Sequence, residues 1–122
     1  MGRPPVNRRE VFRHVMALIE KDEGAVVSIE ELTRAANVSE RSLRSIFLEY
    51  VGLPPRRYLI IRRLHLARQI LRRRMPDRTG VTEAAAQCGF WHFGRFANEY
   101  RQLFGELPSQ TLQSWHPRLF DP

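Results

Sequence analysis

Residues 28–55 read SIEELTRAANVSERSLRSIFLEYVGLPP, and the first part of this segment predicts a short helix. Ser28 and Glu31 have the spacing of a capping box, in which a hydroxyl and a carboxylate satisfy free amides at a helix start. The helical pattern that follows predicts a helix over 29–36. Capping chemistry therefore indicates where this helix begins.

A tight turn and a second helix follow directly. Asn37 tolerates the left-handed conformation that ends a helix, and Ser39 can cap a new one. Between them, Val38 is expected to anchor the corner in the core. The second helix, over 39–51, is expected to bury an apolar stripe of Leu43, Ile46, Phe47, Tyr50 and Val51.

The same pattern occurs again in residues 80–109, which read GVTEAAAQCGFWHFGRFANEYRQLFGELPS. With one inserted residue, the two copies pair Asn37 with Gly89, Val38 with Phe90, Phe47 with Tyr100, Gly52 with Gly105 and Pro55 with Pro108. Such a helix-turn-helix presents its second helix to the ~12 Å wide major groove of DNA. A single copy occurs in many helical bundles, whereas two copies joined by a long helix are a much stronger signal.

Two further amphipathic segments complete the expected fold. Apolar residues at helical spacing predict a helix over 8–22 and a long linker helix over 55–74, which ends in three arginines before a turn over 75–80. We therefore expect an all-α chain of about seven helices. Its expected parts are a first helix-turn-helix subdomain over 1–53, the linker over 54–75 and a second subdomain over 76–122.

The chain is strongly basic, with 20 Lys and Arg against 13 Asp and Glu among 122 residues and a formal net charge of +7. Lys21 is the only lysine, so the charge is carried by guanidinium groups, which bind phosphate bidentately. This balance points first to nucleic acid and second to an anionic membrane surface. Arginines that simply solvate helix faces are the alternative, and charge alone does not decide between them.

Several function classes lack the residues they need. A single cysteine, Cys88, provides no disulfide framework and no thiolate cluster for a metal, and is expected in a buried corner. The histidines are scattered and no paired carboxylates occur, so we expect no enzyme, metal or cofactor. We expect a cytoplasmic protein, because residues 1–9 lack a signal-peptide core and no apolar run is long enough to span a membrane.

From residue 26 to residue 112, the sequence resembles the AraC/XylS family of bacterial transcription regulators. The first half matches at Ser39 to Phe47 and at Gly52-Leu53-Pro54-Pro55 with Tyr58. The second half matches the family's signature segment at Gly89-Phe90, Phe96, Tyr100-Arg101, Phe104-Gly105 and Pro108. The chain departs from the family at Leu53 and Leu107, where a capping serine or threonine is usual before proline, which weakens the caps of the helices that follow.

The resemblance implies a sequence-specific DNA-binding regulator, most often an activator, whose recognition helices enter successive major grooves of double-stranded DNA. Here those helices are expected over 39–51 and 92–104. Activators of this family often contact RNA polymerase, which is therefore an implied partner. The competing hypothesis is a charge-driven nucleic-acid or protein-interaction module without sequence specificity of its own.

Exposed polar side chains of the two recognition helices are the candidate base readers. Arg41 and Arg44 lead because arginine pairs bidentately with guanine, although either can instead meet phosphate or solvent. Asn98 can read adenine, and Phe93 can press on a thymine methyl or, like Trp91, cover the domain surface. The full set is Ser39, Arg41, Ser42, Arg44 and Ser45 in the first helix and His92, Phe93, Arg95 and Asn98 in the second, with Gly94 expected on the same face.

Phosphate contacts are expected at the starts of the later helices, where free amides and basic side chains gather. These contacts add affinity without reading sequence. The candidates are Arg56, Arg57, Arg101, Ser109 and Gln110.

Family members usually carry an effector-binding or dimerising domain ahead of this module, whereas only residues 1–7 precede the first helix here. The chain is thus either a fragment or a stand-alone member. We expect the isolated module to be monomeric, while a full-length regulator can be dimeric. The sequence does not identify an effector, target genes or the sign of regulation.

Overall fold

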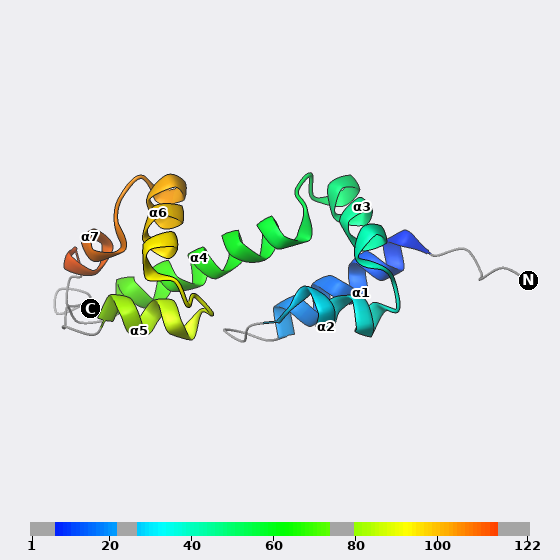
Figure 1. Cartoon of the computed structure of the whole chain (residues 1–122), viewed down its shortest axis with the longest axis horizontal. Helices are drawn as coiled ribbons and strands as arrows, with labels where there is room; N and C mark the ends of the chain where they lie inside the picture. The colour runs from blue at the N-terminus through cyan, green and yellow to red at the C-terminus, as the bar shows by residue number, and fades with distance from the viewer. Residues whose placement is uncertain (1–6, 22–26, 74–79, 115–122) are drawn as a thin grey trace, which may run out of the picture. The chain divides into compact units, whose positions relative to one another are not determined.

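The computed structural model describes residues 7–21, 27–73 and 80–114, and these ranges contain seven α-helices and no β-strand (Figure 1). The expected all-α class is confirmed. The helices are α1 (Arg8–Lys21), α2 (Ile29–Ala36), α3 (Glu40–Tyr50), α4 (Pro55–Arg73), α5 (Gly80–Gln87), α6 (Phe93–Phe104) and α7 (Pro108–Gln113). The expected helix ends at Asp22 and Arg74 and most of the turn over 75–80 lie outside the described residues.

The chain divides into two compact units, Met1–Ile60 and Ile61–Pro122. The division falls inside α4, so the helix that we expected as a separate linker is shared by both units. In the first unit, α1, α2 and α3 all contact one another. In the second, α5, α6 and α7 do the same.

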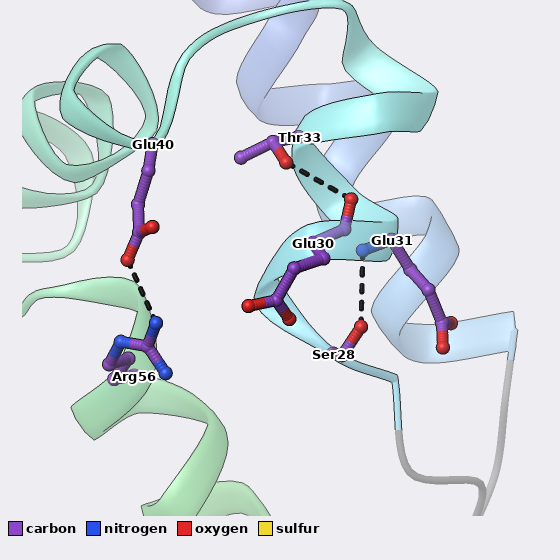
Figure 2. Close-up of polar contacts among 6 residues, drawn as sticks. All are labelled: Ser28, Glu30, Glu31, Thr33, Glu40 and Arg56. Carbon is purple, nitrogen blue, oxygen red and sulfur yellow. Dashed lines mark hydrogen bonds and ion pairs between the residues drawn. The ribbon is translucent and has the colours of Figure 1, made fainter.

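The two ends of α2 have the predicted capping residues. The Ser28 hydroxyl accepts a hydrogen bond from the Glu31 amide at 3.1 Å (Figure 2), although the reciprocal bond from the Ser28 amide to the Glu31 carboxylate is absent among the described residues. Asn37 is left-handed, with φ 54° and ψ 46°, and its amide and that of Val38 bond back into the last turn of α2. The chain can therefore leave α2 and start α3 within three residues.

The core of the first unit gathers apolar side chains from α1, α2, α3 and the start of α4. Phe47 lies at its centre, fully buried, with its ring 5.6 Å from those of Phe12 and Tyr58. Leu59, which the sequence pattern did not single out, is also buried there. The prediction that Tyr50 is buried is wrong: its side chain is 42% exposed and stacks on Phe12 at the edge of the core.

The second turn repeats the first with different residues. Gly89 takes the left-handed conformation, with φ 85°, where the first copy has Asn37. The Phe90 ring packs 4.8 Å from that of Phe96, as expected for a corner residue. Cys88 is buried at the end of α5, as predicted.

A buried hydrogen-bond chain ties α6 to α7. The Tyr100 hydroxyl and the Thr111 hydroxyl lie 2.7 Å apart, and Thr111 also donates to the Glu106 carboxylate at 2.6 Å. Burial is the largest influence on Tyr100 and raises the pKa of its phenol, while the bond to Thr111 acts in the opposite direction. The neutral phenol is therefore the form that the folded unit prefers.

The start of α7 confirms the missing side-chain cap at Leu107. Its role is met in part by Gln110, whose side-chain oxygen accepts a hydrogen bond from the Leu107 amide at 2.7 Å. Within the described ranges, no helix is long and apolar enough to cross a membrane.

Candidate nucleic-acid interface

The outward face of α3 carries four exposed side chains that repeat at helical spacing. Arg41, Arg44 and Ser45 are the predicted members, and Leu48 follows seven residues after Arg41 on the same face. On the other side, Leu43, Ile46 and Phe47 are completely buried. The burial of one side therefore leaves the opposite side of α3 for contact with an outside partner, such as the expected DNA groove.

Leu48 was missed from the sequence. Its side chain is 45% exposed even though it is apolar. The signal was available, because residues 41, 44, 45 and 48 share one face of an ideal helix. An apolar side chain at this place can contact a thymine methyl group.

Ser39 and Ser42 form hydrogen bonds with each other at the start of α3. The Ser39 hydroxyl accepts a hydrogen bond from the Ser42 amide at 3.0 Å and donates one to the Ser42 hydroxyl at 3.1 Å. Ser39 thus caps the helix as the sequence predicted, and Ser42 is half-buried beside it. Base reading by either hydroxyl stays a prediction, and it competes with these internal bonds.

Ser45 has a partner far away in the sequence. The Arg8 guanidinium, at the start of α1, donates to the Ser45 hydroxyl at 3.1 Å and forms an ion pair with Glu49 at 2.7 Å. Local periodicity carries no signal for such a contact between α1 and α3. Arg8 thereby neutralises an acidic side chain on the flank of the outward face.

The two candidate phosphate ligands at the start of α4 differ in their surroundings. The Arg56 side chain is 63% exposed, and its guanidinium lies 2.9 Å from the carboxylate of Glu40, the first residue of α3 (Figure 2). Arg57 is half-buried and already has interaction partners within the chain. A phosphate contact by either arginine stays a prediction.

The outward face of α6 is formed by Arg95, Asn98 and Gln102, all exposed and spaced by three and four residues. Gln102 was missed from the sequence although it extends the same row by one turn. Gly94 is exposed near the start of this helix, as expected. A Cβ atom there would meet only the His92 side chain, at 3.5 Å, so the position has space.

Of the two ring-bearing candidates at the start of α6, Phe93 lies differently from expectation and His92 has a structural role. The Phe93 ring is 6.2 Å from that of Phe96, so Phe93 leans toward the buried side instead of sharing the outward face with the other candidates of α6. It remains 48% exposed at the edge of the helix. The His92 ring nitrogen Nδ1 accepts a hydrogen bond from the Arg95 amide at 3.1 Å and so caps α6. Trp91, in the turn, is 87% exposed.

The remaining phosphate candidates lie on α6 and α7. Arg101, Ser109 and Gln110 are all exposed. Arg101 follows Asn98 by three residues and flanks the outward face of α6. The side-chain oxygen of Gln110 is engaged by the Leu107 amide, which leaves its amide donors for an outside acceptor.

Two neighbouring groups of the second unit, Cys88 and Arg63, have shifted pKa values. Burial raises the pKa of the Cys88 thiol to about 11, and the neighbouring Arg63 guanidinium opposes this rise. Burial also lowers the pKa of Arg63. Among the described residues, no group of three or more His, Cys, Asp and Glu side chains is placed to hold a metal ion.

The exposed hydrogen-bond donors of α3 and α6 suit recognition of hydrogen-bond acceptors and anions.

The chain matches a protein-family model described as a helix-turn-helix domain over residues 32–114. The match begins in α2 and ends at the close of α7, so it spans both helix-turn-helix units.

One relative is the XylDLEGF operon transcriptional activator 2 of Pseudomonas putida, which is 40% identical over 101 residues. The alignment covers 83% of this chain and 64% of that relative. The chain covers 34% of the length of another activator of the same operon. It therefore spans only part of the curated relatives that it matches.

Solved structures show the same fold. A probable AraC family transcriptional regulator from Rhodopseudomonas palustris superposes with a TM-score of 0.76 at 36% identity, covering 88% of this chain and 99% of that one. The DNA-binding domain of the global transcriptional factor AdpA, solved in complex with a target DNA, gives a TM-score of 0.74 at 23% identity over 90% of this chain and 96% of its own. The latter likeness concerns the fold alone.

The family is one of transcription regulators and not of enzymes. The match to its model, the 36% identity over a nearly complete solved relative, and the two helix-turn-helix units agree with one another. The chain therefore belongs to the AraC/XylS family of transcription regulators and contains the double helix-turn-helix DNA-binding domain of that family.

Proposed function

We propose that this chain binds double-stranded DNA in a sequence-specific manner and regulates transcription, with α3 and α6 as its two recognition helices. The observation that carries the proposal is the pair of outward faces. Each follows a tight left-handed turn, each lies opposite a buried apolar stripe, and each carries arginine with smaller polar side chains. Arginine, asparagine and serine are the side chains that read base edges in the major groove.

The two faces divide the reading unequally. On α3, Arg41 and Arg44 are the leading base readers, since a bidentate pair with guanine is worth ~1 to 3 kcal/mol of discrimination. On α6, Asn98 suits adenine and Arg95 suits guanine or phosphate. Direct readout is therefore concentrated in the first unit.

Phosphate contacts position these faces on the duplex. We assign them to Arg56 and Arg57 at the start of α4, Arg101 on α6, and Ser109 and Gln110 at the start of α7. Guanidinium groups and amide donors at helix starts suit phosphate oxygens. The net charge of +7 favours association with DNA of any sequence.

The proposal places α3 and α6 in successive major grooves, one helical turn or ~34 Å apart. The 19 residues of α4 give a spacer of ~28 Å at ~1.5 Å per residue. The remaining difference requires bent DNA or movement between the two units.

Activation through RNA polymerase belongs to the same proposal, as does a monomeric state of this domain by itself. The relatives named as transcriptional activators support activation. Contact with polymerase would place a second macromolecule on surfaces away from the two outward faces.

The experiment that tests the function is selection of binding sites from a random duplex library with the 122-residue chain. We expect enrichment of a non-palindromic motif with two blocks about one helical turn apart. Affinities of the enriched and scrambled duplexes are then measured against salt concentration. Equal binding of both duplexes at every salt concentration would replace the proposal with a charge-driven or protein-interacting module.

A further inference from the structure

An acidic side chain lies at the edge of the first recognition helix. Glu40 begins α3 and its side chain is 57% exposed, next to the predicted base reader Arg41. By charge alone, a carboxylate at this place repels DNA phosphates and weakens binding to every sequence. Its presence therefore needs a reason that compensates for this repulsion.

The structure supplies a partner for Glu40 on another helix. One terminal nitrogen of Arg56, the second residue of α4, lies 2.9 Å from Glu40 Oε1, and both residues belong to the same compact unit (Figure 2). A guanidinium has five N–H donors in a fixed plane, and this bond uses one of them. With 63% of its side chain exposed, Arg56 can bind an outside acceptor while the ion pair persists.

We propose that Glu40 is a positioning residue that holds Arg56 at the start of α4 for contact with a DNA phosphate. The inference rests on the proposed function and adds a role for an acidic residue within it. Without Glu40, the long Arg56 side chain must lose its rotational freedom when DNA binds, and with Glu40 part of that loss is met in the free protein. The ion pair also screens the carboxylate from the phosphates.

Glu40 has a competing structural explanation, because an acidic residue in the first turn stabilises a helix through its dipole. Glu30 provides a matched control. It lies in the first turn of α2, it is exposed, and no ion pair found among the described residues involves its carboxylate. Glu40→Gln and Glu30→Gln raise the net charge equally and remove equivalent dipole interactions, but only the first replaces the ion pair with Arg56 by, at most, a weaker hydrogen bond to a neutral amide.

The test measures binding of the wild-type chain and of the Glu40→Gln, Glu30→Gln and Arg56→Ala variants to the enriched and scrambled duplexes over a range of salt concentrations. Thermal unfolding of each variant reports whether it is folded. Simple electrostatics predicts that both glutamine variants bind DNA more tightly. Positioning predicts opposite signs: Glu30→Gln binds equally or slightly better, whereas Glu40→Gln binds both duplexes about three- to tenfold more weakly, as expected when the rotational freedom of one long side chain is lost only on binding.

The double variant Glu40→Gln/Arg56→Ala shows whether Glu40 affects DNA binding through Arg56. We expect it to bind no more weakly than Arg56→Ala alone, with the salt slope reduced by about one in both, as for one lost phosphate contact. Losses that multiply in the double variant, or a Glu40→Gln chain that gains affinity like Glu30→Gln, would overturn the inference. A loss confined to the enriched duplex would instead make Glu40 a base reader. If the wild-type chain itself does not distinguish the duplexes, it is the proposed function that fails.

Discussion

Among single side chains, Arg41 and Arg44 carry the most specific expectation. Each has an exposed guanidinium on the outward face of α3, above a fully buried stripe. Replacing either by Ala should weaken binding to the enriched duplex by ~10-fold and remove the preference at one base pair, because one bidentate contact is worth ~1 to 3 kcal/mol. Titration of duplexes with single base-pair changes measures this preference.

Arg57→Ala is the comparison for these variants. A residue that contacts phosphate should lower the affinity of all duplexes alike and flatten the dependence on salt. If Arg41→Ala, Arg44→Ala and Arg57→Ala all lose equal affinity on enriched and random DNA, the assignment of α3 as a reading face is wrong.

Gly94 gives a prediction in which stability and binding change in opposite directions. Alanine is the better helix former by up to ~1 kcal/mol, and its Cβ would meet only the His92 side chain at an ordinary 3.5 Å. Gly94→Ala should therefore leave Tm unchanged or slightly raised. Because Gly94 lies exposed at the start of α6, the added methyl group should weaken DNA binding by limiting close approach. A variant with undiminished affinity would show that DNA does not come close at this residue.

At the scale of helices and turns, the sequence predicted most boundaries because local signals determine them. Ser28, Ser39 and the left-handed Asn37 and Gly89 mark helix ends without help from distant residues. The contacts of Arg8 with Ser45 and Glu49 could not be predicted, since they join α1 to α3 across about forty residues.

The sequence predicted which residues make up the candidate site better than it predicted the side of the helix on which each one lies. Periodicity placed Arg41, Arg44, Arg95 and Asn98 outward, whereas Phe93 was grouped with them although it precedes Phe96 by three residues and leans toward it. Residues near the boundary of a buried face depend on packing against neighbouring helices, which a single helical period does not contain. For the same reason Tyr50 was expected inside and lies at the edge.

The hydrogen-bond chain between α6 and α7 should be important for the second unit. Thr111→Val keeps the shape of the side chain but leaves the buried Tyr100 hydroxyl and the Glu106 carboxylate without their bonds to Thr111. We expect a loss of ~1 to 3 kcal/mol in the free energy of unfolding, measured by denaturant titration. Hydrogen exchange should show faster opening in α6 and α7 and unchanged protection in α1 to α3. Equal acceleration in both units would contradict this local role.

The buried Cys88 thiol should make the stability of the second unit depend on pH above pH 9. Burial raises the pKa of its thiol from 9.0 to about 11, so the folded state favours the neutral form. Its contribution to stability is complete below pH 9 and is lost as the pH rises toward 11. The difference in Tm between wild type and Cys88→Ala should therefore shrink between pH 9 and pH 11. A Tm difference that stays constant over this pH range would show that the thiol has the same pKa in the folded and unfolded chains.

At the scale of the whole molecule, two units that share α4 combine two proposed reading faces in one chain. Linking two binding modules makes the second contact intramolecular, which raises affinity without any new contact. The internal repeat made this duplication visible in the sequence. The position of the division inside α4 was not visible, because it depends on which tertiary contacts each half of the helix makes.

The central claim is that α3 and α6 read separate blocks of one DNA site. The direct test repeats the binding-site selection with two variants, Arg41→Ala/Arg44→Ala and Arg95→Ala/Asn98→Ala. We predict that each variant loses the base preferences of one block, a different block for each variant, and keeps those of the other. Loss of the same block in both variants, or an unchanged motif in either, would contradict the account.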